Sequence, residues 1–226
     1  MMCGRFTLTV DPGELKEAFA DFKFPVSFAP RFNIAPTQPV LAIPNDGQNQ
    51  ADFLMWGLIP SWAKDPSMGS RLINARGETL AEKPAFRGGY KYKRCLILAN
   101  GFYEWKSQPG TKTKTPHFIH LRNGEVFAFA GLWDEWHASD GSSIRSCTII
   151  TTTPNELMAT IHDRMPVILQ RSDHAEWLDS APRPPEKLAH LIRPFPAELM
   201  DAYPVSTLVN SPANDRAECI APQAGR

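Results

Sequence analysis

The sequence predicts an α+β fold, a single domain with a mainly antiparallel, curved, barrel-like β-sheet core and short peripheral helices. Proline and glycine number 21 and 14 among 226 residues, which favours many turns and short strands over a helical bundle. A hydrophobic fraction of 42% and six tryptophans indicate a substantial core. No repeat or clear linker divides the chain, so we expect one domain over residues 3–209 and a C-terminal tail over 210–226, loose from Pro212 onward.

Helices and strands follow from the hydrophobic pattern and its breakers. Asp11, Pro12 and Glu14 predict the start of a helix, as cap, first helical residue and capping-box partner. The same pattern recurs at Thr153 and Glu156, ahead of a helical stretch. Two more short helices are expected over 172–179 and 184–192. Apolar runs predict strands over 40–43, 52–58, 94–99, 101–105, 116–121, 126–133, 146–152, 165–169 and 203–209.

Two stretches, 25–39 and 60–92, are predicted to be mostly irregular, because proline, glycine and polar residues interrupt them. Long loops inside a compact domain are usually functional or disordered. Tryptophan, asparagine and arginine residues in the second stretch favour a functional loop.

Charge is distributed unevenly along the chain. The formal net charge is zero, which argues weakly against nucleic-acid binding. From Ser61 to Lys114, however, 11 Lys and Arg stand against 4 Asp and Glu, a local balance of +7. This asymmetry indicates an anionic partner, and a solvated basic face is the alternative interpretation.

The four cysteines, Cys3, Cys95, Cys147 and Cys219, show no CxxC spacing, so neither a zinc site nor another cofactor is expected. Neither a long apolar run nor a secretory signal is evident, so we expect a cytoplasmic protein without disulfides. The strand-like runs around Cys95 and Cys147 predict that both side chains are buried.

Cys3 opens the chain behind two methionines, and three interpretations are open for it. It could form a disulfide, fill a small apolar site, or act chemically. If both methionines are removed, Cys3 carries an α-amine and a thiol on adjacent carbons. This aminothiol can condense with an aldehyde and close a ring.

Other polar residues lie in apolar contexts and each has a functional and a structural interpretation. Glu104, between aromatic residues, is either a desolvated proton donor or a strand residue pointing to solvent. His162 is either a proton shuttle or a helix cap or core residue. Asn74 could orient a nucleophile or make a turn, and Trp62 could stack on a base or fill the core. The arginines could bind phosphates or make surface ion pairs; they are Arg5, Arg76, Arg87 and Arg164.

Eight segments in this order resemble the SRAP family, the SOS-response-associated peptidases that process abasic sites in DNA. They are MCGRF, RFNIAPTQ (31–38), WGLIPSWA (56–63), INARGET (73–79), CLILANGFYEW (95–105), FAFAGLW (127–133), TIITTTPN (148–155) and IHDRMPVIL (161–169). The resemblance extends from Cys3 to about Val209, nearly the whole chain.

The resemblance implies recognition of abasic sites in single-stranded DNA and covalent capture of the sugar aldehyde, by a monomeric protein associated with the nucleoid. The implied catalytic residues are Cys3, Asn74, Glu104 and His162. The implied DNA-binding residues are the arginines Arg5, Arg76, Arg87 and Arg164, with Pro36 and Trp62 as wedge and stacking elements.

In the implied reaction, the Cys3 amine forms an imine with the open-chain sugar and the thiol closes a thiazolidine ring. An α-amine with a pKa of about 7.7–8.0 is partly unprotonated near neutral pH. Glu104 would move protons, His162 would favour sugar opening and adduct release, and Asn74 would hold the terminus. Cleavage of the DNA by β-elimination is a plausible side activity, because it also begins from an imine.

The sequence departs from the family's usual Met-Cys start, because Met2 precedes Cys3. Either translation begins at Met2 or the protein removes its own leader, and the reaction fails if both methionines persist. Two rival functions remain. One is a thiol (auto)peptidase with Cys3 as nucleophile, His162 as base and Glu104 in support. The other is a non-catalytic single-strand binder that uses Trp62 and the arginines.

Overall fold

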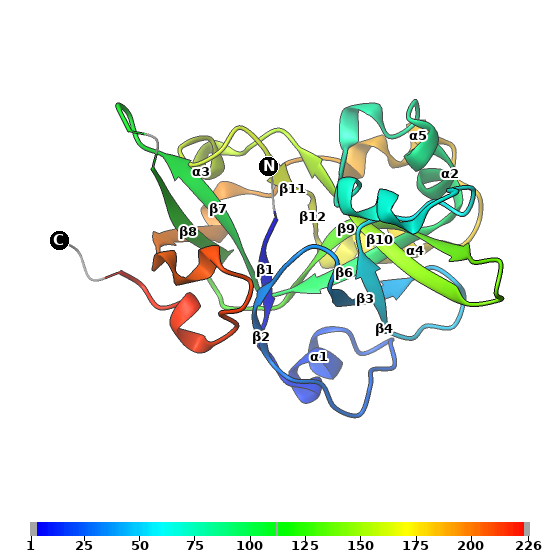
Figure 1. Cartoon of the computed structure of the whole chain (residues 1–226), viewed down its shortest axis with the longest axis horizontal. Coiled ribbons are helices and arrows are strands. Elements are labelled where there is room, and N and C mark those ends of the chain that lie inside the picture. The colour runs from blue at the N-terminus through cyan, green and yellow to red at the C-terminus, as the bar shows by residue number, and fades with distance from the viewer. Residues whose placement is uncertain (1–3, 112, 224–226) are drawn as a thin grey trace.

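The computed structural model describes residues 4–111 and 113–223, whose strands form two sheets (Figure 1). The smaller sheet has five strands in the order β13-β8-β7-β1-β2, and every pairing in it is antiparallel. These strands are β1 (Phe6–Leu8), β2 (Arg31–Ile34), β7 (Gly101–Ser107), β8 (Lys114–Leu121) and β13 (Met200–Pro204).

The larger sheet closes into a barrel. Its order is β11-β10-β4-β3-β6-β9-β12, and an additional β9–β10 pairing joins β10, β4, β3, β6 and β9 in a ring. The ring strands are β3 (Pro39–Pro44), β4 (Asp52–Trp56), β6 (Arg94–Ala99), β9 (Phe127–His137) and β10 (Ser143–Thr152). Three short strands extend it, namely β5 (Asn74–Arg76), β11 (Met165–Pro166) and β12 (Ile168–Leu169). The predicted α+β fold with a barrel-like core is therefore confirmed.

Short helices surround the sheets (Figure 1). The α-helices are α1 (Pro12–Ala18), α2 (Pro84–Tyr92), α3 (Glu156–Ala159), α4 (His174–Leu178) and α5 (Pro185–Leu188). The 3-10 turns are η1 (Pro66–Arg71), η2 (Gly77–Thr79), η3 (Arg171–Asp173), η4 (Ala189–Leu191), η5 (Ala197–Leu199), η6 (Thr207–Asn210) and η7 (Ala217–Cys219). The capping box predicted for α1 is confirmed, because the Asp11 side chain accepts from the Glu14 backbone and the Glu14 side chain accepts from the Asp11 backbone.

Two helix predictions are wrong in detail. The cap of α3 is Asn155, whose side chain accepts a bond from the Met158 amide, and not Thr153. Helix α2 lies inside the stretch predicted to be irregular, with Phe86 and Tyr90 buried one turn apart. Two adjacent glycines lower the helix propensity of this segment, so the sequence did not predict a helix there.

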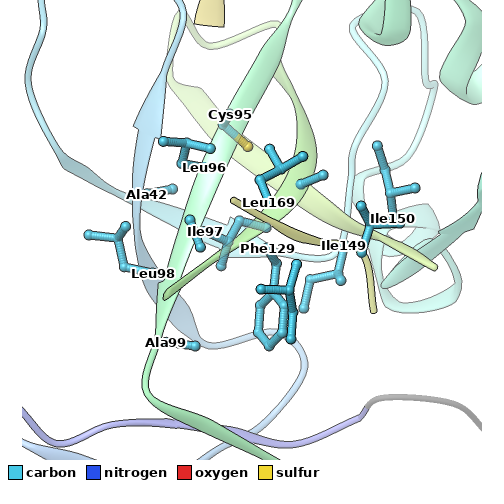
Figure 2. Packing of buried hydrophobic residues seen from close by; sticks show 14 of the residues in the cluster. Ala42, Cys95, Leu96, Ile97, Leu98, Ala99, Phe129, Ile149, Ile150 and Leu169 are labelled. Carbon is cyan, nitrogen blue, oxygen red and sulfur yellow. The ribbon is translucent and has the colours of Figure 1, made fainter. Parts of the chain in front are cut away.

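The barrel core consists of aliphatic and aromatic side chains from β3, β6, β9 and β10, several of them shown in Figure 2. Phe6, from the smaller sheet, joins this core. Its ring centroid lies 5.1 Å from that of Trp56 and 5.7 Å from that of Phe129, both in edge contacts. Aromatic edge contacts add to the free energy gained by burial, so Phe6 packs the smaller sheet against the barrel.

A loose tail was expected from Pro212 onward, whereas the described part of the C-terminal segment, 210–223, forms hydrogen bonds with β2. The Asp215 carboxylate accepts bonds from the backbone amides of Phe32 and Asn33. The Asn33 side chain donates in turn to three backbone carbonyls, those of Val209, Ser211 and Asn214. These bonds connect the edge strand β2 with residues nearly 200 positions later in the chain. The sequence analysis did not predict β2. A domain boundary near residue 209 stays a prediction.

Burial of two cysteines was predicted correctly. The thiols of Cys95 and Cys147 are inside the barrel, and burial raises the pKa of both well above the usual range. Among the described residues, no helix has the length and apolar character needed to span a membrane.

Candidate active site

Glu104 is buried in the smaller sheet, with 1% of its surface exposed. It lies on β7 opposite His117 of β8, and it alternates with Tyr103 and Trp105, which point to the other face. Phe102, on the same face as Glu104, packs its ring against Phe129 of the barrel. The alternative of a solvent-facing Glu104 is therefore wrong, and the carboxyl group lies in the region between the sheets.

His162, which follows α3, faces this carboxyl group. Its Nε2 atom lies 4.0 Å from Oε2 of Glu104. Burial lowers the pKa of His162, and the nearby Asp163 carboxylate opposes part of that shift. The ring is therefore mostly neutral near pH 7, the form in which histidine can both donate and accept a proton.

Each neutral tautomer of His162 has a partner at Nδ1. The Arg164 backbone N–H lies 3.2 Å from Nδ1 and can donate to it, which leaves the proton on Nε2 toward Glu104. The Asp163 carboxylate lies 2.9 Å from the same atom and can accept a proton from it. Because its neighbours can stabilise either tautomer, His162 is suited to accept a proton at one ring nitrogen and donate one from the other.

Cys3 lies outside the described residues. The chain just after it pairs with β7, because Phe6 is opposite Phe102 and the Arg5 carbonyl accepts a 3.0 Å bond from the Tyr103 amide. The described chain therefore begins beside the strand that carries Glu104.

Asn74 and Arg76 are the first and last residues of β5, which pairs in parallel with β10. The last of these pairs is Arg76 with Thr151, and the Thr151 carbonyl also accepts a 2.9 Å bond from Arg164. The structure thus brings β5 and the segment after α3 together at the end of β10. Arg76 is exposed, whereas Asn74 is half-buried.

Arg164 is clamped by Glu78. Both terminal nitrogens of Arg164 donate to the Glu78 carboxylate, and this hydrogen bonding lowers the pKa of Glu78. A bidentate arginine–carboxylate pair is geometrically specific. The clamp joins η2, which contains Glu78, to the segment that carries His162.

Arg5 donates to groups of the protein itself. Its guanidinium contacts the Asn33 side chain at 2.9 Å and the carbonyls of Val209 and Asn210. Burial lowers the pKa of Arg5, although the usual value is so high that the group stays charged. In this structure Arg5 ties the start of β1 to the C-terminal segment.

Pro36 is half-buried in the turn between β2 and β3, where the Gln38 amide donates to the Ala35 carbonyl. Thr37 has a φ of 67°, a left-handed conformation that costs energy for a β-branched residue. Proline followed by a positive φ is typical of a type II turn. Such backbone strain is often found at functional sites.

Trp62 is 57% exposed on a loop that is anchored on both sides. The Ser61 amide donates to Asp134 at 2.8 Å, and Trp136 donates its indole N–H to the Ala63 carbonyl at 2.7 Å. At the base of the loop, a Cβ on Gly57 would lie 2.6 Å from the Gly69 carbonyl oxygen, so the two backbones need glycine to approach. These contacts present a large aromatic surface to solvent at a fixed place.

Sequence reasoning missed the residues that hold this site together. They are Asn33, Glu78, Asp134, Trp136 and Asp215. Asn33 and Glu78 lie within recognised segments, RFNIAPTQ and INARGET, and could have been singled out there. For the others, the partner is too distant in sequence for any local signal.

Comparisons with known proteins agree on one family. The chain matches the SOS response associated peptidase (SRAP) family over residues 2–212. It is 49% identical over 222 residues to abasic site processing protein YoqW of Bacillus subtilis, covering 97% of this chain and 99% of that protein. Abasic site processing protein HMCES of Gallus gallus is 34% identical, over 98% of this chain and 78% of its own length. A solved structure from Bacteroides thetaiotaomicron has a TM-score of 0.87 at 24% identity, covering 98% of this chain and all of that one, and supports the fold.

Proposed function

Because this chain belongs to the SOS response associated peptidase (SRAP) family, we propose that it captures abasic sites in single-stranded DNA as a covalent cross-link through Cys3. The relatives named above are abasic site processing proteins. The observation that carries the proposal is the buried Glu104 facing His162, beside the strand from which the described chain begins.

The proposed reaction needs no other reactant. With Met1 and Met2 removed, the Cys3 amine adds to C1′ of the open-chain sugar aldehyde. Loss of one water gives an imine, and addition of the thiol sulfur to the same carbon closes a thiazolidine, with the thiol proton ending on nitrogen. Glu104 donates the proton that lets the hydroxyl group leave as water. His162, 4.0 Å away, opens the sugar ring and assists the reverse reaction.

The remaining site residues are assigned by position. Asn74 orients the amino terminus from β5, while Trp62 stacks on a neighbouring base and Pro36 enters the gap left by the missing base. Arg76 and Arg87 are exposed and bind phosphates. Arg164 is bound by Glu78, and Arg5 is bound by the C-terminal segment. Each of these arginines binds a phosphate only after it releases its hydrogen-bond acceptor in the protein.

Further properties follow from the same proposal. The protein acts as a monomer near the nucleoid, and its imine intermediate also permits slow β-elimination of the DNA. A thiol peptidase activity is confined to removal of its own leading methionines, which makes the terminal amine.

One experiment tests the proposal. The purified protein is incubated with single-stranded DNA that contains one abasic site, and the products are separated on a denaturing gel, with intact mass measured in parallel. We expect a heat-resistant adduct whose mass equals protein plus DNA minus one water. The adduct should be absent for Cys3→Ser. Retention of both methionines in adduct-forming protein, or adduct formation by Cys3→Ser, would refute the mechanism.

A further inference from the structure

Helix α2 carries an unpaired row of positive charge. Lys83, its N-cap residue, and Arg87 and Lys91 follow at intervals of four residues, and all three are exposed. Residues four apart lie on one face of a helix, about 6 Å apart along its axis. Phe86 and Tyr90 are buried on a neighbouring face of the helix. We call these three side chains the α2 row.

No acidic side chain neutralises the α2 row within the helix, since Pro84–Tyr92 contains neither aspartate nor glutamate. Among the described residues, none of the recorded ion pairs involves Lys83, Arg87 or Lys91. Arg5, Arg94 and Arg164, by contrast, bind acceptors of the protein. Lys93 and Arg94, also in the basic segment 61–114, bind acceptors of the protein, so the α2 row is among the parts of this segment whose positive charge is available to a ligand.

The α2 row connects two parts of the candidate site. At its start, the Lys83 amide donates to the carbonyl of Thr79, the last residue of η2, the turn that contains Glu78. Just past its end, Lys93 donates to Asp134 at 2.7 Å, and Asp134 also holds the Ser61 amide beside Trp62. The helix thus spans from the turn that clamps Arg164 to the loop that presents Trp62.

An exposed aromatic ring accompanies the charges. Tyr92 is 48% exposed, and the Lys91 ammonium lies 5.0 Å from its ring centroid. Cations spaced along a line beside exposed rings are the pattern with which proteins bind a single nucleic-acid strand. In Figure 1, α2 lies on one side of the start of β1, and the β7–β8 hairpin lies on the other.

From this arrangement, which rests on the proposed function, we propose that the α2 row binds the phosphates of the DNA strand that flanks the abasic site. The strand passes from the Glu104–His162 pair over η2 and along α2 toward Trp62. The row adds affinity for the strand independently of whether a base is missing, because phosphates are present at every nucleotide.

The test uses a variant that removes the charge of the row, Lys83→Gln/Arg87→Gln/Lys91→Gln. A matched control removes three exposed cations elsewhere, Lys16→Gln/Lys23→Gln/Arg216→Gln. Binding to long and short oligothymidylates, which contain no abasic site, is measured by fluorescence anisotropy between about 50 and about 200 mM salt. Thermal unfolding confirms that both variants are folded.

We expect the row variant to bind the long strand at least about tenfold more weakly than the control, and its salt slope to fall by about 2. The ratio of the affinity for the long strand to the affinity for the short strand should also be smaller in the row variant. An unchanged salt slope, or an equal loss in row variant and control, would overturn the inference. Adduct formation by the unmodified protein is scored separately on abasic DNA, so failure of the proposed function is a distinct result.

Discussion

Nε2 of His162 lies 4.0 Å from Oε2 of Glu104, across the gap between the segment after α3 and strand β7. This separation is longer than a hydrogen bond and places the two groups side by side. Because Glu104 is buried, its proton exchange with solvent is restricted and the histidine is its natural partner.

Replacement of Glu104 by Gln should slow adduct formation by roughly 100-fold and leave DNA affinity nearly unchanged, because the amide keeps the shape but cannot donate the same proton. Time courses on denaturing gels and anisotropy titrations measure the two quantities. Glu125→Gln, which changes an exposed carboxylate outside the site, is the control. An equal loss of rate and affinity in Glu104→Gln would argue against acid–base catalysis.

The double variant Glu104→Gln/His162→Asn should be little slower than the slower of the two single variants, because Glu104 and His162 act on successive steps and the slower step limits the rate. His162→Asn alone should also slow release of the adduct. Rates of adduct formation by the unmodified protein, the two single variants and the double variant form a double-mutant cycle. Strictly multiplicative effects would mean that the two residues act independently on one and the same step, against the proposed division of roles.

Asp215→Ala should lower the free energy of unfolding by about 2 kcal/mol, since the amides of Phe32 and Asn33 would lose their acceptor. It should also slow capture, because Asn33 and Val209 hold Arg5 at the start of β1. Urea unfolding and the gel assay provide the measurements. Glu218→Ala removes an exposed carboxylate of the same segment and should cost less than about 0.5 kcal/mol.

Trp136→Phe keeps an aromatic ring but removes the N–H that binds the Ala63 carbonyl, so the Trp62 loop should lose one of its two anchors. We expect severalfold weaker binding to single-stranded DNA and a stability loss of about 1 kcal/mol. Anisotropy and urea titrations measure both effects. Trp105→Phe, which loses a comparable bond to Asn210 elsewhere, tests whether weaker binding is specific to this loop.

Stability should decrease as the pH falls below about 6.5, because burial lowers the pKa of three histidines, His117, His162 and His174. The unfolded chain then binds more protons than the folded one, so protonation favours unfolding. Urea unfolding at mildly alkaline and mildly acidic pH measures the change. His174→Phe keeps the stacking on Phe19 and should reduce the pH dependence; an unaltered dependence would exclude His174 as a cause.

The sequence was sufficient for features governed by nearby residues. Apolar runs predicted most strands, and the capping box at Asp11 and Glu14 predicted α1. The closure of the barrel through β9 and β10, the strand β2 and the packing of the C-terminal segment depend on contacts between distant residues, which leave no local pattern. For the site, the resemblance singled out Glu104 and His162, whereas the internal partners of Arg5 and Arg164 required coordinates.

The partners of the first strand have a consequence for the order of events during synthesis. Phe6 pairs with Phe102, and the guanidinium of Arg5 binds a carbonyl 204 residues further along the chain. Translation makes the amino end first, yet that end acquires its last neighbours only when the ribosome has nearly finished. A nascent chain therefore exposes its first strand until the residues around Val209 have been synthesised.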